Sequence, residues 1–112
     1  MPNQSAQLTQ VFSALADPTR RAVLARLGGG PCATSELSRR FPMALPSFTQ
    51  HLDVLEDCGL VTSRKVGRVR TYALAPKRLA VAEQWLSQRR AEWTRRLDSL
   101  DAYLDTVKKE RS

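Results

Sequence analysis

The sequence has few of the residues that build disulfide frameworks and metal sites. Its 112 residues include two cysteines, Cys32 and Cys58, and one histidine, His51. Two cysteines are too few for a disulfide framework, and they suit a reducing cytoplasm. A zinc site made only of Cys and His takes four ligands, more than one chain supplies here. We therefore expect no metal site and no cofactor, and the sequence leaves open a redox role for either cysteine.

Long apolar runs are also missing. No stretch approaches the roughly 18 uninterrupted apolar residues of a membrane-spanning helix. Residues 1–9 are polar and lack the apolar segment of a secretory signal. A basic last helix could still lie on a membrane surface, but the acidic residues along it would be repelled by anionic lipid: Glu92, Asp98, Asp101 and Asp105. The sequence thus predicts a cytoplasmic protein that does not bind a membrane.

Acidic residues are absent between Asp57 and Glu83, although the chain as a whole has a net charge of +7. The same stretch contains six basic residues, namely Arg64, Lys65, Arg68, Arg70, Lys77 and Arg78. Such local asymmetry is typical of a surface that binds nucleic acid. The alternative is a basic hairpin that is simply solvated.

Hydrophobic spacing and helix-ending residues indicate the order of elements. A chain of this length forms one compact domain, which we expect to span 1–112. The predicted elements are a helix around 8–15, a helix from Asp17-Pro18 to Gly28, a helix over 34–41, a helix from Leu45-Pro46 to Gly59, strands at 60–66 and 69–74 around Gly67-Arg68, and a helix over 76–108. This order predicts a mostly α-helical winged helix-turn-helix with a small β-hairpin. Residues 8–75 would form the core and wing.

The fourth predicted helix has the features of a helix that contacts DNA bases. Phe48, Leu52 and Leu55 share one face, and Gln50 lies opposite. Hydroxyl and amide side chains suit base edges, and the basic hairpin follows directly. Ser47, Thr49, Gln50 and His51 are the candidate contacts on this helix, and Arg64, Lys65, Arg68 and Arg70 are those on the wing. The alternative is an ordinary polar face on an amphipathic helix.

His51 lies beside the core face of that helix, where a histidine commonly has a structural role. Ser47 and His51 are four residues apart, but no third catalytic group or oxyanion-hole motif accompanies them. We therefore expect no enzymatic activity. RNA binding is disfavoured because Trp85 and Trp93 lie on the last helix, away from the predicted recognition helix, so no aromatic stacking platform is evident.

The last predicted helix carries a seven-residue repeat of apolar side chains. Leu86, Trp93 and Leu100 belong to the repeat, and Leu97 and Leu104 add a second heptad position. A helix of about 30 residues spans roughly 45 Å, longer than a domain of this size. Part of the repeat therefore needs another surface, either a second copy of the chain or a different protein.

Three segments together resemble the ArsR-type (arsenic-repressor-like) winged-helix transcriptional regulators. They are Leu15-Ala16-Asp17-Pro18-Thr19-Arg20-Arg21, the run from Ser47 to Leu52 with its continuation to Val61, and Gly67-Arg68 with Tyr72-Ala73-Leu74. The resemblance covers about residues 8–76. It implies a homodimeric cytoplasmic repressor that binds an inverted-repeat operator. It also implies that the first helix completes the dimer interface, which gives the set Leu8, Phe12, Leu86, Trp93, Leu97, Leu100 and Leu104.

The sequence departs from the metal-sensing members of that family. The segment Thr34-Ser35-Glu36-Leu37-Ser38 has no thiol, and the last helix has no histidine. We accordingly expect DNA binding that does not respond to metals, and the sequence identifies no effector. The alternative function is a winged-helix module that binds protein and has no sequence-specific DNA binding.

Overall fold

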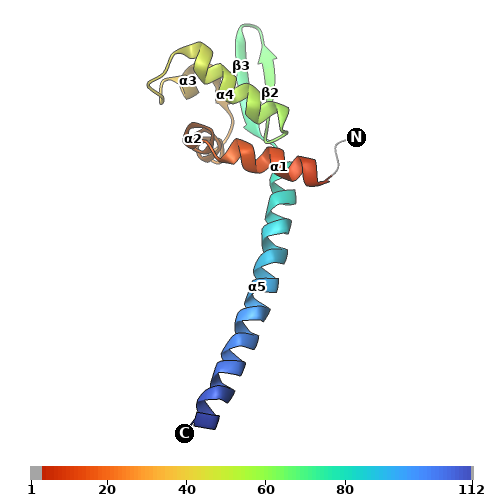
Figure 1. The fold of residues 1–112 in the computed structure, drawn as a ribbon. Helices are drawn as coiled ribbons and strands as arrows, with labels where there is room; N and C mark the ends of the chain where they lie inside the picture. Colours follow the sequence, from red (N-terminus) through yellow and green to blue (C-terminus); the bar gives the residue numbers. More distant parts are fainter. Residues whose placement is uncertain (1–3, 112) are drawn as a thin grey trace. The chain divides into compact units, whose positions relative to one another are not determined.

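The computed structural model describes residues 4–111 and divides into two compact units, one ending at Ala82 and the other beginning at Glu83. Figure 1 labels the elements, except the short β1. In chain order they are α1 (Gln4–Leu15), α2 (Pro18–Leu27), β1 (Cys32–Ala33), α3 (Thr34–Ser38), α4 (Leu45–Asp57), β2 (Val61–Val66), β3 (Val69–Leu74) and α5 (Pro76–Arg111). The mostly helical winged helix-turn-helix predicted from the sequence is confirmed. The boundary between the units lies within α5, so Pro76–Ala82 belong to the first unit.

The junction between α1 and α2 follows the predicted capping pattern. Asp17 is the N-cap of α2, with extended backbone, and its side chain accepts a hydrogen bond from the Arg20 N–H at 2.9 Å. Pro18 occupies the first turn, where its missing N–H costs nothing. Gly28 ends the helix at the predicted position.

The helix-turn-helix pair is α3 and α4, and α3 is shorter than predicted. It ends at Ser38 instead of reaching Phe41, and two i+3 hydrogen bonds continue the chain as a turn, from the Arg40 N–H to Leu37 and from the Phe41 N–H to Ser38. The Phe41 ring stacks on that of Phe48 in α4, at 5.1 Å between the ring centroids. Side-chain packing therefore holds this turn after the helix has ended.

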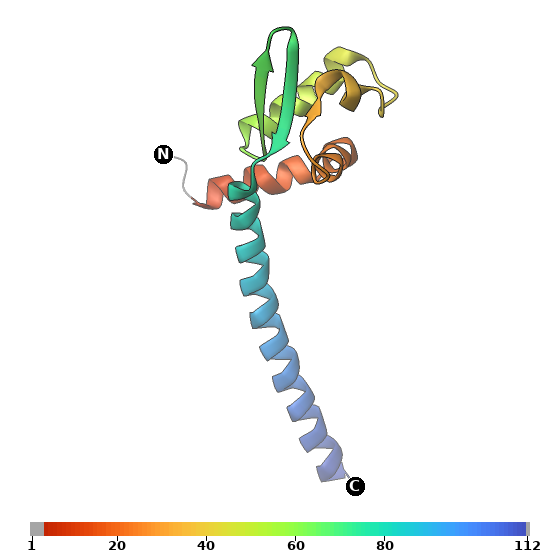
Figure 2. The same cartoon turned by 180° about the vertical axis from the view of Figure 1, so that it is seen from behind.

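The sheet has three strands in the order β1-β3-β2, one more than the sequence predicted. Strands β2 and β3 form the predicted antiparallel hairpin, in which Val61 pairs with Leu74 and Val66 with Val69. The added strand β1, drawn in orange in Figure 2, pairs Cys32 with Tyr72 of β3. Cys32 is thus a buried residue of a strand.

The core of the first unit takes its side chains from every element. The largest fully buried ones are Phe48, Leu37, Leu52, Leu55, Leu60, Val11, Val23 and Val61. Tyr72 is buried, and Leu74 packs against this core. Ala82 is the last buried residue of the first unit. The buried face of α4 is therefore set by the core, which leaves its polar face toward solvent.

Gly59 lets the chain turn from α4 toward the hairpin. Its φ of +79° lies in the left-handed region, which favours glycine. A Cβ atom at this position would lie 2.7 Å from Cγ of Arg78 in the first turn of α5. Both the backbone angle and the close approach of Arg78 therefore require glycine here.

Candidate nucleic-acid interface

The polar face of α4 presents two freely exposed side chains near its N-terminal end. Ser47 and Gln50 are exposed, while Phe48 between them is buried. Thr49 is half-buried, and its hydroxyl donates to the Leu45 carbonyl at 2.9 Å. The Thr49 hydroxyl is thus already committed to the backbone, so Ser47 and Gln50 are the freer of the predicted base contacts on α4.

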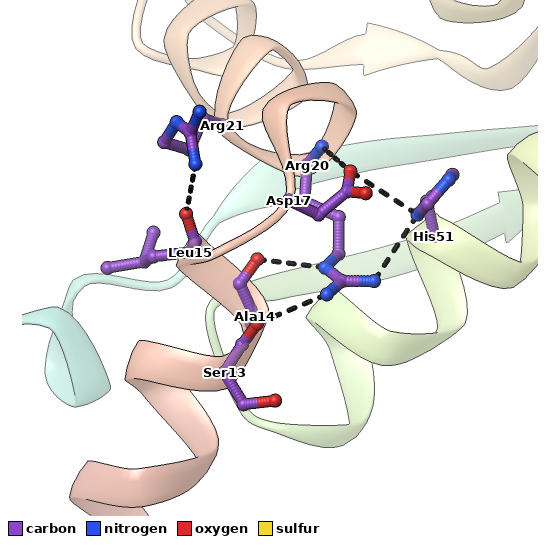
Figure 3. A network of polar contacts seen from close by, with 7 residues as sticks. All are labelled: Ser13, Ala14, Leu15, Asp17, Arg20, Arg21 and His51. Atoms are coloured by element: carbon purple, nitrogen blue, oxygen red, sulfur yellow. Dashed lines mark hydrogen bonds and ion pairs between the residues drawn. The ribbon is translucent and has the colours of Figure 1, made fainter.

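The fourth candidate on this helix, His51, faces the corner between α1 and α2. Its Nδ1 lies 3.3 Å from Nη1 of Arg20 and 3.7 Å from Oδ2 of Asp17. The His51 side chain keeps 23% of its surface exposed. Figure 3 shows these contacts together with the backbone of α1. His51 therefore links the recognition helix to a cluster of polar groups that the sequence analysis did not find.

Arg20 is the centre of this group, which we name the Arg20 cluster: Asp17, Arg20, His51 and the carbonyls of Ser13 and Ala14. The Arg20 Nε donates to the Ala14 carbonyl at 2.8 Å, and its Nη2 donates to the Ser13 carbonyl at 3.1 Å. The Arg20 guanidinium folds back over the end of α1, because the last carbonyls of a helix lack partners within it.

Asp17 contributes a fixed negative charge to the Arg20 cluster. The hydrogen bond from the Arg20 backbone N–H lowers the pKa of Asp17 below its ordinary value, and the nearby charge of the Arg20 guanidinium adds to this effect. Partial burial works in the opposite direction. Asp17 is therefore ionised at neutral pH and serves as both helix cap and counter-charge.

The wing displays the predicted basic side chains on the hairpin. Arg64, Lys65, Arg68 and Arg70 are all exposed. The turn between the strands holds Gly67 at a φ of +61°, which suits a tight hairpin turn and leaves Arg68 at the tip. Three of the four residues, Arg64, Lys65 and Arg68, have no protein hydrogen bond among the described contacts, so their charges are available for an anionic partner.

Arg70 differs from the other three because it holds the wing to α4. Its Nη1 donates to the Ser63 hydroxyl at 2.8 Å, and that hydroxyl donates to Glu56 near the end of α4. We name Glu56, Ser63 and Arg70 the wing relay. The Arg70 carbonyl also accepts a hydrogen bond from Thr34 at 3.1 Å. The sequence showed these residue types but not their pairing, which depends on the register of β2 with β3.

In the second unit, α5 carries an exposed row of apolar side chains, which we name the apolar stripe: Leu86, Trp93, Leu97, Leu100 and Leu104. Their exposed fractions run from 47% for Leu104 to 61% for Leu97. Elsewhere on this unit, Arg89 pairs with Glu92 at 3.1 Å and lies over the Trp85 ring. Exposed leucines at heptad spacing are typical of a helix that pairs with another surface. In the first unit, Leu8 and Phe12 of α1 are partly buried against the core, so only part of each side chain is left for the interface predicted for them.

The two cysteines are both buried. Burial raises the pKa of the Cys32 and Cys58 thiols, which disfavours the thiolate form needed for redox chemistry. Cys32 donates to Glu36 at 3.5 Å, and Cys58 donates to the Leu55 carbonyl. Over residues 4–111, no three His, Cys, Asp or Glu side chains gather closely enough to hold a metal ion. In the same range, no helix is long and apolar enough to cross a bilayer.

Comparison with known proteins agrees with this geometry. A family model described as a helix-turn-helix domain matches residues 15–64, from the end of α1 into β2. The HTH-type transcriptional regulator Rv2034 of Mycobacterium tuberculosis (strain ATCC 25618 / H37Rv) is 40% identical over 97 residues, which cover 87% of this chain and 88% of that protein. The similarity therefore extends beyond the helix-turn-helix itself.

Solved structures give the family. The crystal structure of the ArsR family transcriptional regulator RHA00566 is similar with a TM-score of 0.78 at 48% identity, over 84% of this chain and 97% of that one. The solution structure of the homodimeric winged helix-turn-helix DNA-binding domain Mb0332 from Mycobacterium bovis, a possible ArsR-family regulator, has a TM-score of 0.60 at 30% identity, over 77% and 79% of the two chains. This chain belongs to the ArsR family of winged helix-turn-helix transcriptional regulators.

Proposed function

We propose that this chain is a transcriptional repressor that binds double-stranded DNA sequence-specifically as a homodimer in the cytoplasm. One observation carries the proposal. The exposed Ser47 and Gln50 on α4 are followed along the chain by a hairpin whose Arg64, Lys65 and Arg68 are exposed. Side chains suited to base edges thus stand beside charges suited to phosphates. The regulators to which the chain is similar support this role over an enzymatic one.

In this proposal the N-terminal half of α4 enters the major groove. The Gln50 side-chain amide can form two hydrogen bonds with adenine, one donated by its nitrogen and one accepted by its oxygen, and the Ser47 hydroxyl can bond several bases. Asp53 and Asp57 are exposed in the second half of α4, where phosphates would repel them, so that half leaves the groove. Arg68 at the wing tip contacts the DNA backbone or the minor groove, which adds affinity and salt dependence without sequence choice.

A homodimer would present two such surfaces. The apolar stripe of α5 forms the interface, with Leu8 and Phe12 of α1 contributing to it. The homodimeric relative supports this assembly. A two-fold axis would place the two recognition helices on half-sites about 34 Å apart, one turn of DNA, and so select an inverted repeat. Occupancy of such a site within a promoter is enough to block transcription.

The test uses the purified full-length chain and a random-sequence duplex library. Repeated selection should recover an inverted repeat, and footprinting should find the same sequence upstream of the chain's own gene. Affinity for the selected duplex should fall steeply between low and moderate salt, since several phosphate contacts release counterions. Failure to enrich any sequence, together with binding that hardly changes with salt, would contradict the proposal and favour a protein-binding module.

A further inference from the structure

The Arg20 cluster joins three helices at one histidine. The Arg20 guanidinium binds two carbonyls at the end of α1 and, through Nη1, approaches His51 Nδ1 of α4 at 3.3 Å. Arg20 itself lies in the first turn of α2. The Arg20 side chain thus links the recognition helix to the α1–α2 corner, on the side of α4 that Figure 3 shows.

The direction of the hydrogen bond to His51 fixes where the imidazole carries its proton. A guanidinium is always charged and can only donate, so the atom facing Arg20 must accept. Nδ1 accepts only when it is unprotonated, which leaves the proton of the neutral ring on Nε2. The competing arrangement has Nδ1–H donating to Asp17, but the distance of 3.7 Å is too long for a hydrogen bond.

The other side of the ring then becomes a donor. In Figure 3, the second ring nitrogen of His51 lies on the edge away from Arg20 and Asp17. The side chain is 23% exposed, and it directly follows the exposed Gln50 on the recognition helix. A neutral N–H at this place suits a phosphate oxygen, because side-chain donors to phosphates set the register of a protein on the duplex.

We propose that Arg20 is a positioning residue for DNA binding: it holds His51 as the Nε2–H tautomer and directs that N–H to a phosphate beside the bases that Gln50 contacts. This inference rests on the proposed function of α4. It assigns to the α1–α2 corner a role in DNA affinity that Arg20 exerts only through His51. If Arg20 had only a structural role, its replacement would lower the stability of the fold to the same extent with or without His51.

The first experiment examines the protein without DNA. His51 is the one histidine of the chain, so ¹⁵N-labelled protein gives a single, unambiguous pair of imidazole signals. At about pH 8.5, where an ordinary imidazole is neutral, the parent should show a protonated Nε2 and an unprotonated Nδ1. In Arg20→Met, Nδ1–H becomes free to turn to Asp17, and the signals should shift toward the other tautomer. A parent with its proton on Nδ1 overturns the inference.

The second experiment is a double-mutant cycle on the selected duplex. Arg20→Met should weaken binding about tenfold in the parent and about twofold or less in the His51→Ala background, because the effect passes through His51. Equal losses in both backgrounds overturn the inference. Arg21→Met is the matched control: it removes the same charge from the neighbouring position, where the Arg21 side chain donates to the Leu15 carbonyl at 2.7 Å. Its effect should be the same in both backgrounds.

Two further measurements keep these results interpretable. Thermal unfolding of each variant shows whether it folds, and Arg20→Leu, which also lacks a donor, replaces Arg20→Met in the cycle should the latter not fold. A parent that binds no selected duplex contradicts the proposed repressor function, whereas the tautomer measurement still decides whether Arg20 controls His51.

Discussion

The two units of this chain bury their apolar side chains in different ways. In the first unit, Phe48, Leu52 and Leu55 of α4 are fully buried by the unit's own elements. In the second, the leucines of the apolar stripe remain about half exposed on a single helix. These leucine side chains are thus buried by the chain itself in the first unit, whereas those in the second unit stay exposed and can be buried only by a partner.

The two units therefore differ in what stabilises them. The first unit has a core, a side-chain cap on α2 and a three-stranded sheet, so its folding should not depend on protein concentration. An isolated helix in water is marginal, and most helical stability in proteins comes from packing an apolar face. The helix of the second unit should therefore depend on self-association, which makes concentration the variable that distinguishes the two units.

The largest effect is expected from charges placed in the apolar stripe. Leu97→Glu combined with Leu100→Glu would bury four unpaired carboxylates in a dimer, a severe penalty. Sedimentation at micromolar concentration should show a dimer for the parent and a monomer for the variant. Ser99→Glu with Ala102→Glu is the control, because these exposed positions lie off the stripe. A parent that sediments as a monomer would refute the interface.

The next effect concerns the core of the first unit. Leu52→Ala should lower the free energy of unfolding by about 2–5 kcal/mol, since it leaves a cavity among fully buried side chains. Leu104→Ala on the stripe is the comparison. In urea titrations at two protein concentrations, the loss from Leu104→Ala should depend on concentration and that from Leu52→Ala should not. Equal behaviour of the two variants would contradict the division into units.

Substitutions on α4 and on the wing should affect DNA binding differently, the first changing sequence specificity and the second general affinity. Gln50→Ala should cost about 1–3 kcal/mol on the selected duplex and much less on a scrambled one. Arg68→Ala should weaken both duplexes alike and reduce the log–log salt slope by about one per lost phosphate contact, hence about two in a dimer. The measurement is affinity for both duplexes at several salt concentrations. An unchanged salt slope for Arg68→Ala would show that the proposed placement of the wing on the DNA is wrong.

A smaller effect is expected at the cap of α2. Asp17→Ala should cost about 1 kcal/mol, whereas Asp17→Asn retains a capping side chain and should cost less at neutral pH. The pKa of Asp17 is lowered in the folded protein, so its carboxylate stabilises the fold above the unfolded-state pKa, and this contribution is lost as the pH falls through the folded-state value. The stability difference between the parent and Asp17→Asn should therefore shrink in acid. A difference that grows in acid would contradict this account.

Metals are expected to leave DNA binding unchanged, which makes this the smallest of the predicted effects. Zinc, cadmium or arsenite added to a preformed DNA complex under reducing conditions should not release the DNA, because Cys32 and Cys58 are both buried, Cys32 in β1 and Cys58 in the turn after α4. Release at a stoichiometric amount of metal would show that the two thiols, or those of two chains, do form a site.

The sequence predicted the elements that have strong local signals. The Asp17-Pro18 cap, the exit of α4 near Gly59 and the hairpin around Gly67 were placed correctly because each depends on a few neighbouring residues. Strand β1 was missed because two residues are too short for a period, and its pairing with Tyr72 is set by a segment far along the chain. The prediction that α3 reaches Phe41 was wrong because Leu37 and Phe41 have the four-residue spacing of a helix face, although Phe41 packs on Phe48 from the turn that follows α3.

The site was predicted unevenly for the same reason. The exposure of Ser47 and Gln50 follows from helical spacing, and that of Arg64, Lys65 and Arg68 from their place on a hairpin. The inward turn of Arg20 and the pairing of Arg70 with Ser63 depend on partners in other elements, which no periodicity reveals. The assignment of individual DNA and dimer contacts remains a prediction that the experiments above test.

The wing relay and strand β1 have a consequence for the entropy of binding. A lone two-stranded hairpin is only marginally stable in water, but here β3 is held on one side by β1 and tied through Arg70 and Ser63 to Glu56 of α4. The entropy cost of ordering this part of the hairpin therefore arises during folding, before any DNA is present. Binding then has to immobilise only the basic side chains, and such preorganisation raises affinity without adding a single contact to the duplex.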